Sequence, residues 1–273
     1  MSTTTITAEL PHIHSRSARR PRLVNAELLK LRKRRGLVLA TFALTVLPMI
    51  VAYTVLLILH ATEPAKHGPA GGLENFSGSM YVLTQLGVVA ATLLGATAGA
   101  GDLGSGVFRE LVVTGRSRLA LFAARVPAGL GLAVAVVWAG FAVTAVASTV
   151  LTGSLEAPSA GLLVESAAWL AIVVGLALIL ALGVSSAIGS RGTTIGVVVG
   201  WQLVLMPFLL QMGILGSLRE LLPFAATERV GPSALFDSGV AVPMSLGVAI
   251  AVIAAWTLVP LAAGAWRTST RDA

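Results

Sequence analysis

Residues 37–60 read LVLATFALTVLPMIVAYTVLLILH, an apolar run that follows the basic cluster Arg32-Lys33-Arg34-Arg35. A transmembrane α-helix needs about 20 predominantly apolar residues to cross the hydrocarbon core of a bilayer. This run contains no lysine, arginine or acidic residue and reaches that length. The apolar core of a cleaved signal peptide is shorter, about 7–15 residues. We therefore expect the run to remain in the protein as a membrane span, anchored by the basic cluster.

Similar apolar runs recur along the rest of the chain. The predicted spans are residues 37–60, 81–101, 119–151, 162–189, 193–212 and 242–266. The composition agrees, because 56% of the residues are hydrophobic and 11% are charged, whereas soluble domains carry about 25% charged residues. The sequence predicts an all-α polytopic membrane protein with six transmembrane helices.

Lysine and arginine are distributed unevenly between the two sides that these spans define. Cytoplasmic loops of membrane proteins carry an excess of both residue types. With a cytoplasmic N-terminus, every lysine and arginine falls on the cytoplasmic side except Lys66, Arg219 and Arg229. The acidic residues of the opposite side are Glu63, Glu74, Glu156, Glu165, Glu220, Glu228 and Asp237. We expect a multi-pass protein of the cell (plasma) membrane with both termini in the cytoplasm.

The N-terminal region divides into two parts. Residues 1–21 contain scattered Ser, Thr and Arg and show no apolar period, which predicts a disordered cytoplasmic tail ahead of a transmembrane domain at residues 22–273. Residues 22–35 predict an amphipathic helix at the membrane surface, with Val24, Leu28 and Leu31 on one side. The opposite side holds Arg22, Glu27, Lys30, Lys33 and Arg34. The alternative is a plain basic anchor with no further role.

A second amphipathic element follows the second span, at residues 102–118. Ser105 can cap a short helix and Gly115 can end it. The apolar face of this helix consists of Val107, Phe108, Leu111 and Val112, while Arg109 and Glu110 remain for polar contacts. A short helix of this kind, parallel to the membrane, is a surface to which a partner protein can bind.

Small residues recur at four-residue spacing in three spans. The series are Gly87, Ala91, Gly95 and Gly99; Ala177, Ala181, Ser185 and Gly189; and Gly192, Gly196 and Gly200. Such series let transmembrane helices approach closely. We favour packing within the chain over a seam between two chains.

Pro48, Pro127, Pro207 and Pro260 lie in or at the ends of spans, where static kinks are favoured over hinges.

The chain lacks the groups that would energise transport by itself. It has no Gly-x-x-x-x-Gly-Lys-Ser/Thr loop to hold nucleotide phosphates. Ionisable groups inside spans mark proton relays and ion-coupled carriers, and we expect the span interiors to be free of them. Energy for any pumping would have to come from another subunit, bound on the cytoplasmic face.

Catalytic, metal-binding and nucleic-acid-binding roles are disfavoured. Cysteine is absent, so thiolate sites are excluded. His12 and His14 lie in the polar tail, and His60 and His67 flank a loop with Glu63; solvated side chains explain both groups better than a metal site. The basic residues cluster beside apolar spans, which disfavours nucleic-acid binding. We assign no catalytic residue and no metal ligand.

Taken together, these elements resemble the type-2 ABC permease family, the membrane subunits of many bacterial ABC exporters. The matching residues are Asp102, Gly106, Arg109, Leu111, Arg118 and Arg125, preceded by the stretch ELLKLRKRR at residues 27–35. The six-span order and a long outer segment, with a short helix expected at residues 218–224, also fit. The Glu-Ala-Ala loop of ABC importer permeases is not evident between Asp102 and Arg125, which favours export.

The resemblance implies specific partners and sites. Residues 22–35 would be an elbow helix, and the loop at residues 102–118 would carry a coupling helix that enters a cleft of a cytoplasmic ATPase subunit, which binds ATP and Mg²⁺. A second permease protomer, identical or related, would complete the path. The implied coupling residues are Asp102, Gly106, Phe108, Arg109, Glu110, Leu111 and Arg118. The second and fifth spans would line the path, with Thr84, Gln85, Thr92, Gln202 and Gln211 as candidate substrate contacts.

Two other functions remain open from the residues alone. A membrane scaffold, or an immunity protein that shields the cell from a peptide toxin, could use the same loop for simple tethering. An ion- or proton-coupled carrier would move substrate without an ATPase, but it needs titratable groups at mid-membrane. A nearby gene for an ATP-binding subunit would favour the exporter.

The expected topology can be tested with reporter fusions. A reporter joined after Lys66 should show extracytoplasmic activity, because this connection lies on the side that is poor in lysine and arginine. A reporter joined after Ala273 should show cytoplasmic activity. Cytoplasmic activity after Lys66 would invert the topology.

Overall fold

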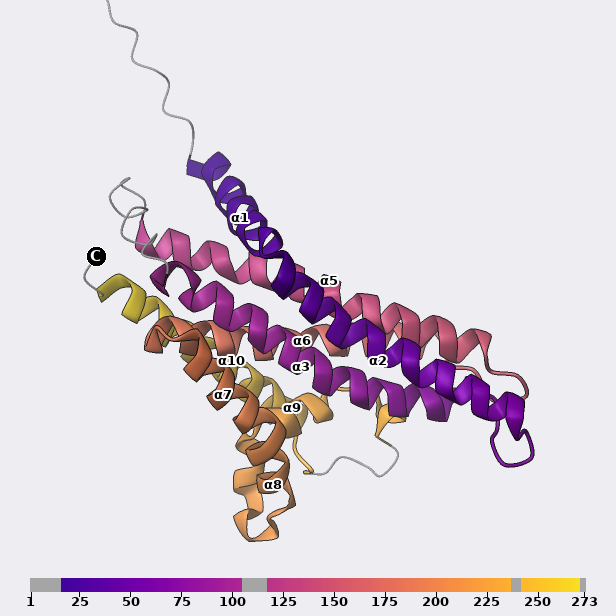
Figure 1. Cartoon of the computed structure of the whole chain (residues 1–273). Helices are drawn as coiled ribbons and strands as arrows, with labels where there is room; N and C mark the ends of the chain where they lie inside the picture. Colours follow the sequence, from indigo (N-terminus) through magenta and orange to yellow (C-terminus); the bar gives the residue numbers. More distant parts are fainter. Residues whose placement is uncertain (1–15, 105–116, 237–241, 271–273) are drawn as a thin grey trace, which may run out of the picture.

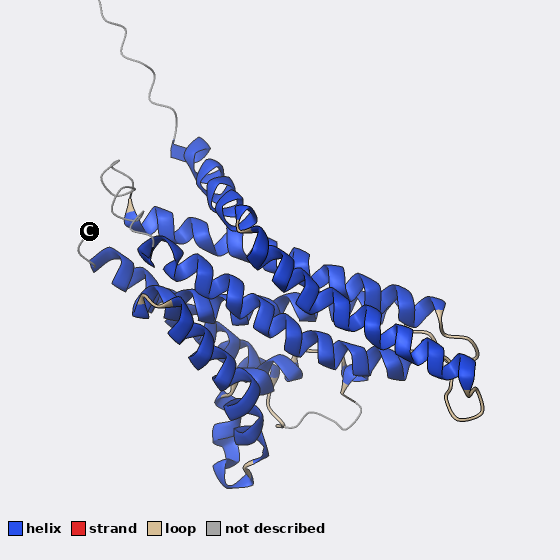
Figure 2. Ribbon diagram, viewed as in Figure 1, coloured by secondary structure: helices blue, strands red, loops and turns tan. Residues whose placement is uncertain are grey.

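The computed structural model describes residues 16–104, 117–236 and 242–270, and within these ranges all regular structure is helical (Figure 2). Six helical segments in the described ranges are long and apolar enough to cross a membrane, which confirms the predicted number. They are α2 (Arg35–Thr62), α3 (Leu73–Gly104), α5 (Arg118–Val150), α6 (Ala160–Ile188), the fifth span (Arg191–Gln211) and α10 (Leu246–Thr270).

Several boundaries differ from the expected ones. The first helix, α1 (Arg16–Lys33), begins inside the expected tail at residues 1–21. Helix α3 starts at Leu73 instead of residue 81, because its first turns cover the outer end of the bundle, where Phe76 is fully buried. The sixth span covers residues 246–270 instead of 242–266. Helix α6 ends where Gly189 adopts a left-handed conformation (φ 80°), a common helix terminator.

The ends of the helices divide into two groups (Figure 1). Helix α1, the end of α3, the start of α5 and the end of α10 lie at one end of the bundle, whereas residues 63–72 and 151–159 connect helices at the other end. The first group is the end that the distribution of lysine and arginine assigns to the cytoplasm. We call it the basic end below.

Helices α3 and α6 form the centre of the bundle, and α3 is the most buried span. Their small-residue series face one another. A Cβ atom at Gly95 would meet the backbone oxygen of Leu178 and would lie 3.1 Å from the Cβ of Ala181. One turn further, Gly99 lies against Leu182 and Ser185. The prediction of packing within the chain is therefore correct for these two series.

The third series is different, because Gly192, Gly196 and Gly200 are not covered. Apart from chain neighbours and the backbone of the same helix, no heavy atom of the described residues comes within 4 Å of a Cβ atom built at any of the three. Helix α7 (Arg191–Gly200), which carries them, therefore presents a smooth face that other described helices do not occupy.

The fifth span is broken near its middle. After α7 the chain forms a π-helical turn, η1 (Trp201–Leu205), and a short helix, α8 (Met206–Gln211). In the π turn the N–H of Met206 donates to the carbonyl oxygen of Trp201. Pro207 has no N–H to donate, so the wider turn accommodates the proline inside the span.

The outer segment after the fifth span folds back toward the bundle (Figure 1). It contains a 3₁₀ helix, η2 (Gly213–Leu221), and the helix α9 (Pro223–Arg229), which packs against α10. The single short helix expected at residues 218–224 is therefore wrong. Leu222 adopts an extended conformation, and Pro223 starts a new helix, because proline is favoured in a first helical turn.

Large apolar side chains cover the outside of the bundle. Examples are Leu39 (68% exposed), Val164 (71%) and Val259 (67%), on three different spans. In water such a surface would aggregate, whereas in a bilayer it contacts lipid tails.

Gly95→Ala tests the contact between α3 and α6. The added methyl group meets the backbone of α6, so we expect a loss of about 1–3 kcal/mol in stability, measured as a lower midpoint of thermal unfolding in detergent. Gly78→Ala is the matched control on the same helix, because no heavy atom lies within 4 Å of its Cβ position. We expect it to be neutral or slightly stabilising. Equal effects of the two variants would contradict the close contact.

Candidate functional site

A small cavity, of about 50 Å³, lies where the second and fifth spans meet α6, α9 and α10. Its lining residues are Thr84, Gln85, Val88, Val173, Leu176, Ala177, Leu180, Gln202, Met206, Pro223, Phe224, Thr227 and Trp256. None of these described residues carries a charge. We call this space the central cavity.

Two amides provide the hydrogen-bonding groups of the central cavity. The hydroxyl of Thr84 donates to the carbonyl oxygen of Met80 (2.7 Å), and that of Thr227 donates to Phe224 (2.9 Å). Both hydroxyl protons are thus used within their own helices. Gln85 and Gln202 face the cavity from α3 and from the π turn. Each amide offers two N–H donors and a carbonyl acceptor to a bound molecule.

An aromatic wall closes the side of the cavity toward α10. Trp256 stacks on Trp201, with ring centroids 5.7 Å apart and an interplanar angle of 25°. The indole N–H of Trp256 donates to the carbonyl oxygen of Leu221 (2.9 Å), which joins the end of η2 to α10. A second indole, that of Trp169, donates to the carbonyl oxygen of Thr227 and holds α9 against α6. The outer segment is therefore fastened to two spans beside the cavity.

The central cavity is chemically suited to an uncharged group. Moving an ionised group from water into an apolar space without a partner is very costly, whereas an amide or hydroxyl needs only a hydrogen bond. The cavity offers two amides and aromatic faces for such a group. A proton-coupled carrier needs titratable groups in its substrate site. The described lining residues of the cavity include none.

The cavity gathers three of the five predicted substrate contacts. Thr84 and Gln85, which are neighbours in the second span, line it together with Gln202 of the fifth span. Thr92 does not, because it is fully buried and its hydroxyl donates to the carbonyl oxygen of Val88 (2.8 Å). Gln211 is exposed at the end of α8 and also lies outside the lining.

Most of the predicted coupling residues lie outside the described residues. These are Gly106, Phe108, Arg109, Glu110 and Leu111. Asp102 was expected in a loop but belongs to the last turn of α3. Arg118 is the first residue of α5, and its Nη1 atom donates to the carbonyl oxygen of Ser269 in α10 (3.4 Å).

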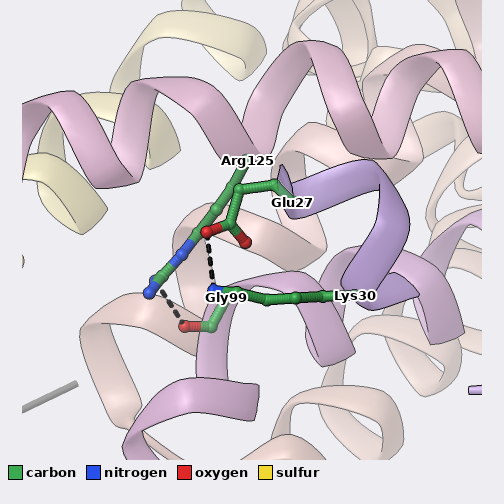
Figure 3. Close-up of polar contacts among 4 residues, drawn as sticks. All are labelled: Glu27, Lys30, Gly99 and Arg125. Atoms are coloured by element: carbon green, nitrogen blue, oxygen red, sulfur yellow. Dashed lines mark hydrogen bonds and ion pairs between the residues drawn. The ribbon is translucent and has the colours of Figure 1, made fainter. Parts of the chain in front are cut away.

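A buried charged group lies at the basic end of the bundle (Figure 3). Arg125 of α5 is 1% exposed, and its Nη1 atom donates to the carbonyl oxygen of Gly99 in α3 (3.2 Å). Glu27 of α1 is 7% exposed and forms an ion pair with Lys30, with 2.7 Å between Nζ and Oε1. Both charges come from helices that pack against one another.

These two residues correct the sequence-based interpretation. Arg125 lies at the end expected to be cytoplasmic, but it is buried within α5, whereas the span interiors were expected to hold no ionisable group. Glu27 was assigned to the polar side of α1, yet that position faces the bundle because α1 packs on α5. The sequence did contain an indication that Arg125 is buried, because this residue lies several positions inside the apolar run 119–151.

The histidines of the outer loop do not form a joint site with Glu63. The Nδ1 atom of His60 lies 2.8 Å from the carbonyl oxygen of His67, and Glu63 pairs with Lys66 (2.9 Å). The described residues contain no group of three or more His, Asp or Glu side chains that could hold a metal ion.

A comparison with protein-family profiles identifies the family of the chain. No curated protein shows significant sequence similarity to the chain. The profile of the ABC-2 family transporter proteins matches residues 23–205, from α1 to the π turn of the fifth span. The match includes Arg125, Gly99, Gln85 and Gln202. The chain therefore belongs to the ABC-2 family of transporter proteins, the membrane permeases of ABC transporters.

Proposed function

We propose that the chain is the permease subunit of an ATP-driven exporter of the cell membrane. The observation that carries the transport role is the central cavity, because it joins the second and fifth spans and holds two amides in an otherwise apolar lining. Membership of the ABC-2 family supports an ATP-binding partner. The chain itself has no phosphate-binding loop, so we assign the binding of ATP and Mg²⁺, and the ATPase activity, to that partner.

The cycle follows from two coupled movements. Two cytoplasmic ATPase subunits close on ATP and push the coupling helix at residues 105–115 of each permease protomer. The spans transmit this displacement as rigid bodies and open the outer side of the path. Hydrolysis of ATP restores the inward-facing state. The direction is export, because the Glu-Ala-Ala loop of importers is not evident between Asp102 and Arg125.

The lining of the central cavity limits the chemistry of the transported molecule. The part of the substrate that enters it is uncharged and mostly apolar, with a group that can pair with Gln85 or Gln202. The aromatic rings of Phe224 and Trp256, which line the cavity, favour a flat or aromatic body. The same lining argues against an ion-coupled carrier.

A second permease protomer, identical or related, completes the path. The uncovered glycines of α7, Gly192, Gly196 and Gly200, support this arrangement. Small residues let two transmembrane helices approach closely, and van der Waals contact then replaces the hydrophobic drive that lipid removes. The turn that carries Gln202 follows this face directly, so a partner there would lie beside the central cavity.

Docking of the ATPase can be tested by charge insertion. Phe108→Asp or Leu111→Asp puts a carboxylate into the apolar face of the predicted coupling helix, so the ATPase should co-purify at least about ten-fold less well. Thr193→Asp is the matched control, because it adds the same charge at an exposed position at the start of α7, outside the predicted coupling loop. Membrane insertion should be unchanged in all three variants. Undiminished co-purification of the Phe108 and Leu111 variants would contradict the proposed docking.

The central cavity can be tested with one substitution at two positions. Gln202→Leu removes a hydrogen-bonding group from the lining and should reduce transport of uncharged apolar compounds about two- to ten-fold. Gln211→Leu makes the same change outside the cavity and should have no effect. The measurement is the accumulation of a panel of neutral and charged fluorescent compounds by cells. Equal losses for both variants, or preferential transport of the charged compounds, would contradict this part of the proposal.

A further inference from the structure

Arg125 is a cation buried inside a membrane-spanning helix. Removing a guanidinium from water is costly, and an apolar side chain of similar size would fill the site at lower cost. Ionisable groups within spans are accordingly rare and mark functional sites by default. Arg125 lies near the basic end of α5, away from the lining of the central cavity. Substrate contact in that cavity therefore does not explain it.

Arg125 and a residue of α6 meet at the same carbonyl oxygen of α3. The Nη1 atom of Arg125 donates to the carbonyl oxygen of Gly99, and the hydroxyl of Ser186 in α6 donates to the same oxygen (3.4 Å). Gly99 has no side chain to keep these groups away. A Cβ atom there would lie 2.9 Å from the Oγ of Ser186 and would meet Leu182 and Ser185. Helices α5 and α6 thus both hold the basic end of α3.

Helix α1 reaches the same junction from the membrane surface. Glu27 of α1 is 7% exposed and pairs with Lys30 (Figure 3), on a helix that packs against α5. Arg34, the residue between α1 and α2, lies against α3 two residues after Gly99, with Nη2 3.0 Å from the Cβ position of Gly101. The end of α3 is therefore in contact with groups from three other elements, and two of them are cationic.

We propose that Arg125 is a positioning residue for transport, which joins α5 to the basic end of α3, where α6 and the junction of α1 and α2 also meet it, so that these ends move as one body. This inference rests on the proposed function, because it concerns how the ATPase stroke reaches the substrate path. Gly99 and Gln85 are on the same helix, about 21 Å apart at 1.5 Å per residue. A displacement imposed at the junction thus arrives at the central cavity through a continuous α-helix.

The absence of cysteine in the chain makes the movement measurable. Leu29→Cys on α1 and Tyr81→Cys on α3 introduce two exposed labelling sites, 52% and 64% exposed. Spin labels at this pair report the distance between α1 and the outer half of α3, in the isolated chain in lipid nanodiscs and in the complex with its ATPase. With Arg125 present we expect one narrow distance distribution. Arg125→Met should broaden it at least about two-fold. An unchanged narrow distribution overturns the inference.

A coupling measurement separates positioning from simple stability. In the reconstituted complex, Arg125→Met should lower the number of substrate molecules moved per ATP hydrolysed about ten-fold, while ATPase binding and basal ATP hydrolysis persist. Arg125→Lys, which keeps a charge and a donor, should restore part of that ratio. Arg267→Met is the matched control, because Arg267 is exposed at the end of α10. An unchanged ratio in Arg125→Met would also overturn the inference.

Two further outcomes are distinguishable. If Arg125→Met does not give a monodisperse protein, Glu27→Leu tests the junction from the side of α1 and should broaden the same distance distribution; a narrow one contradicts the inference. If the native chain binds no ATPase, the proposed function fails. The label distances in nanodiscs still decide whether Arg125 keeps the ends of α1 and α3 in one body.

Discussion

The close approach of α3 and α6 is the contact on which the rest of the structure depends. Lipid tails are as apolar as leucine, so burial alone does not hold two spans together in a bilayer. Gly95 and Gly99 let the backbone of α3 touch that of α6, and many weak van der Waals contacts replace the missing hydrophobic drive. The other spans pack around this pair, with α2 and α5 on α3 and α10 on α6.

The same helix connects the two functional regions. Its basic end meets Arg125, Ser186 and Arg34, and its middle carries Thr84 and Gln85 into the central cavity. The opposite wall of the cavity is irregular, because the fifth span contains a π turn before Pro207. A rigid helix that faces an irregular one is an arrangement in which a shift of one wall changes the shape of the cavity between them.

The residue types that line the candidate site could be predicted from the sequence. Which of the predicted residues line it could not. Thr84, Gln85 and Gln202 share the cavity, while Thr92 and Gln211 have similar side chains and lie outside it. The difference is position, because Thr92 lies about two turns beyond Thr84 on α3 and Gln211 lies at the exposed end of α8, after the π turn. Arg125 and Glu27 show the same limit. A charge near the end of a span looks like a membrane anchor until a neighbouring helix is seen to cover it.

The sequence by itself determined that the chain lies in a membrane, that it is helical and how many spans it has. In the hydrocarbon core every backbone N–H and C=O group must be paired within the protein, which a helix achieves, and the thickness of the core sets the length of a span. The sequence also indicated which ends of the spans share the lysine- and arginine-rich side, since these residues are costly to move across a bilayer. Only the tertiary structure decided which small-residue series are internal, where the fifth span breaks and which charges are buried. Those features depend on contacts between residues distant in the chain, such as Gly99 with Arg125, and periodicity carries no information about such pairs.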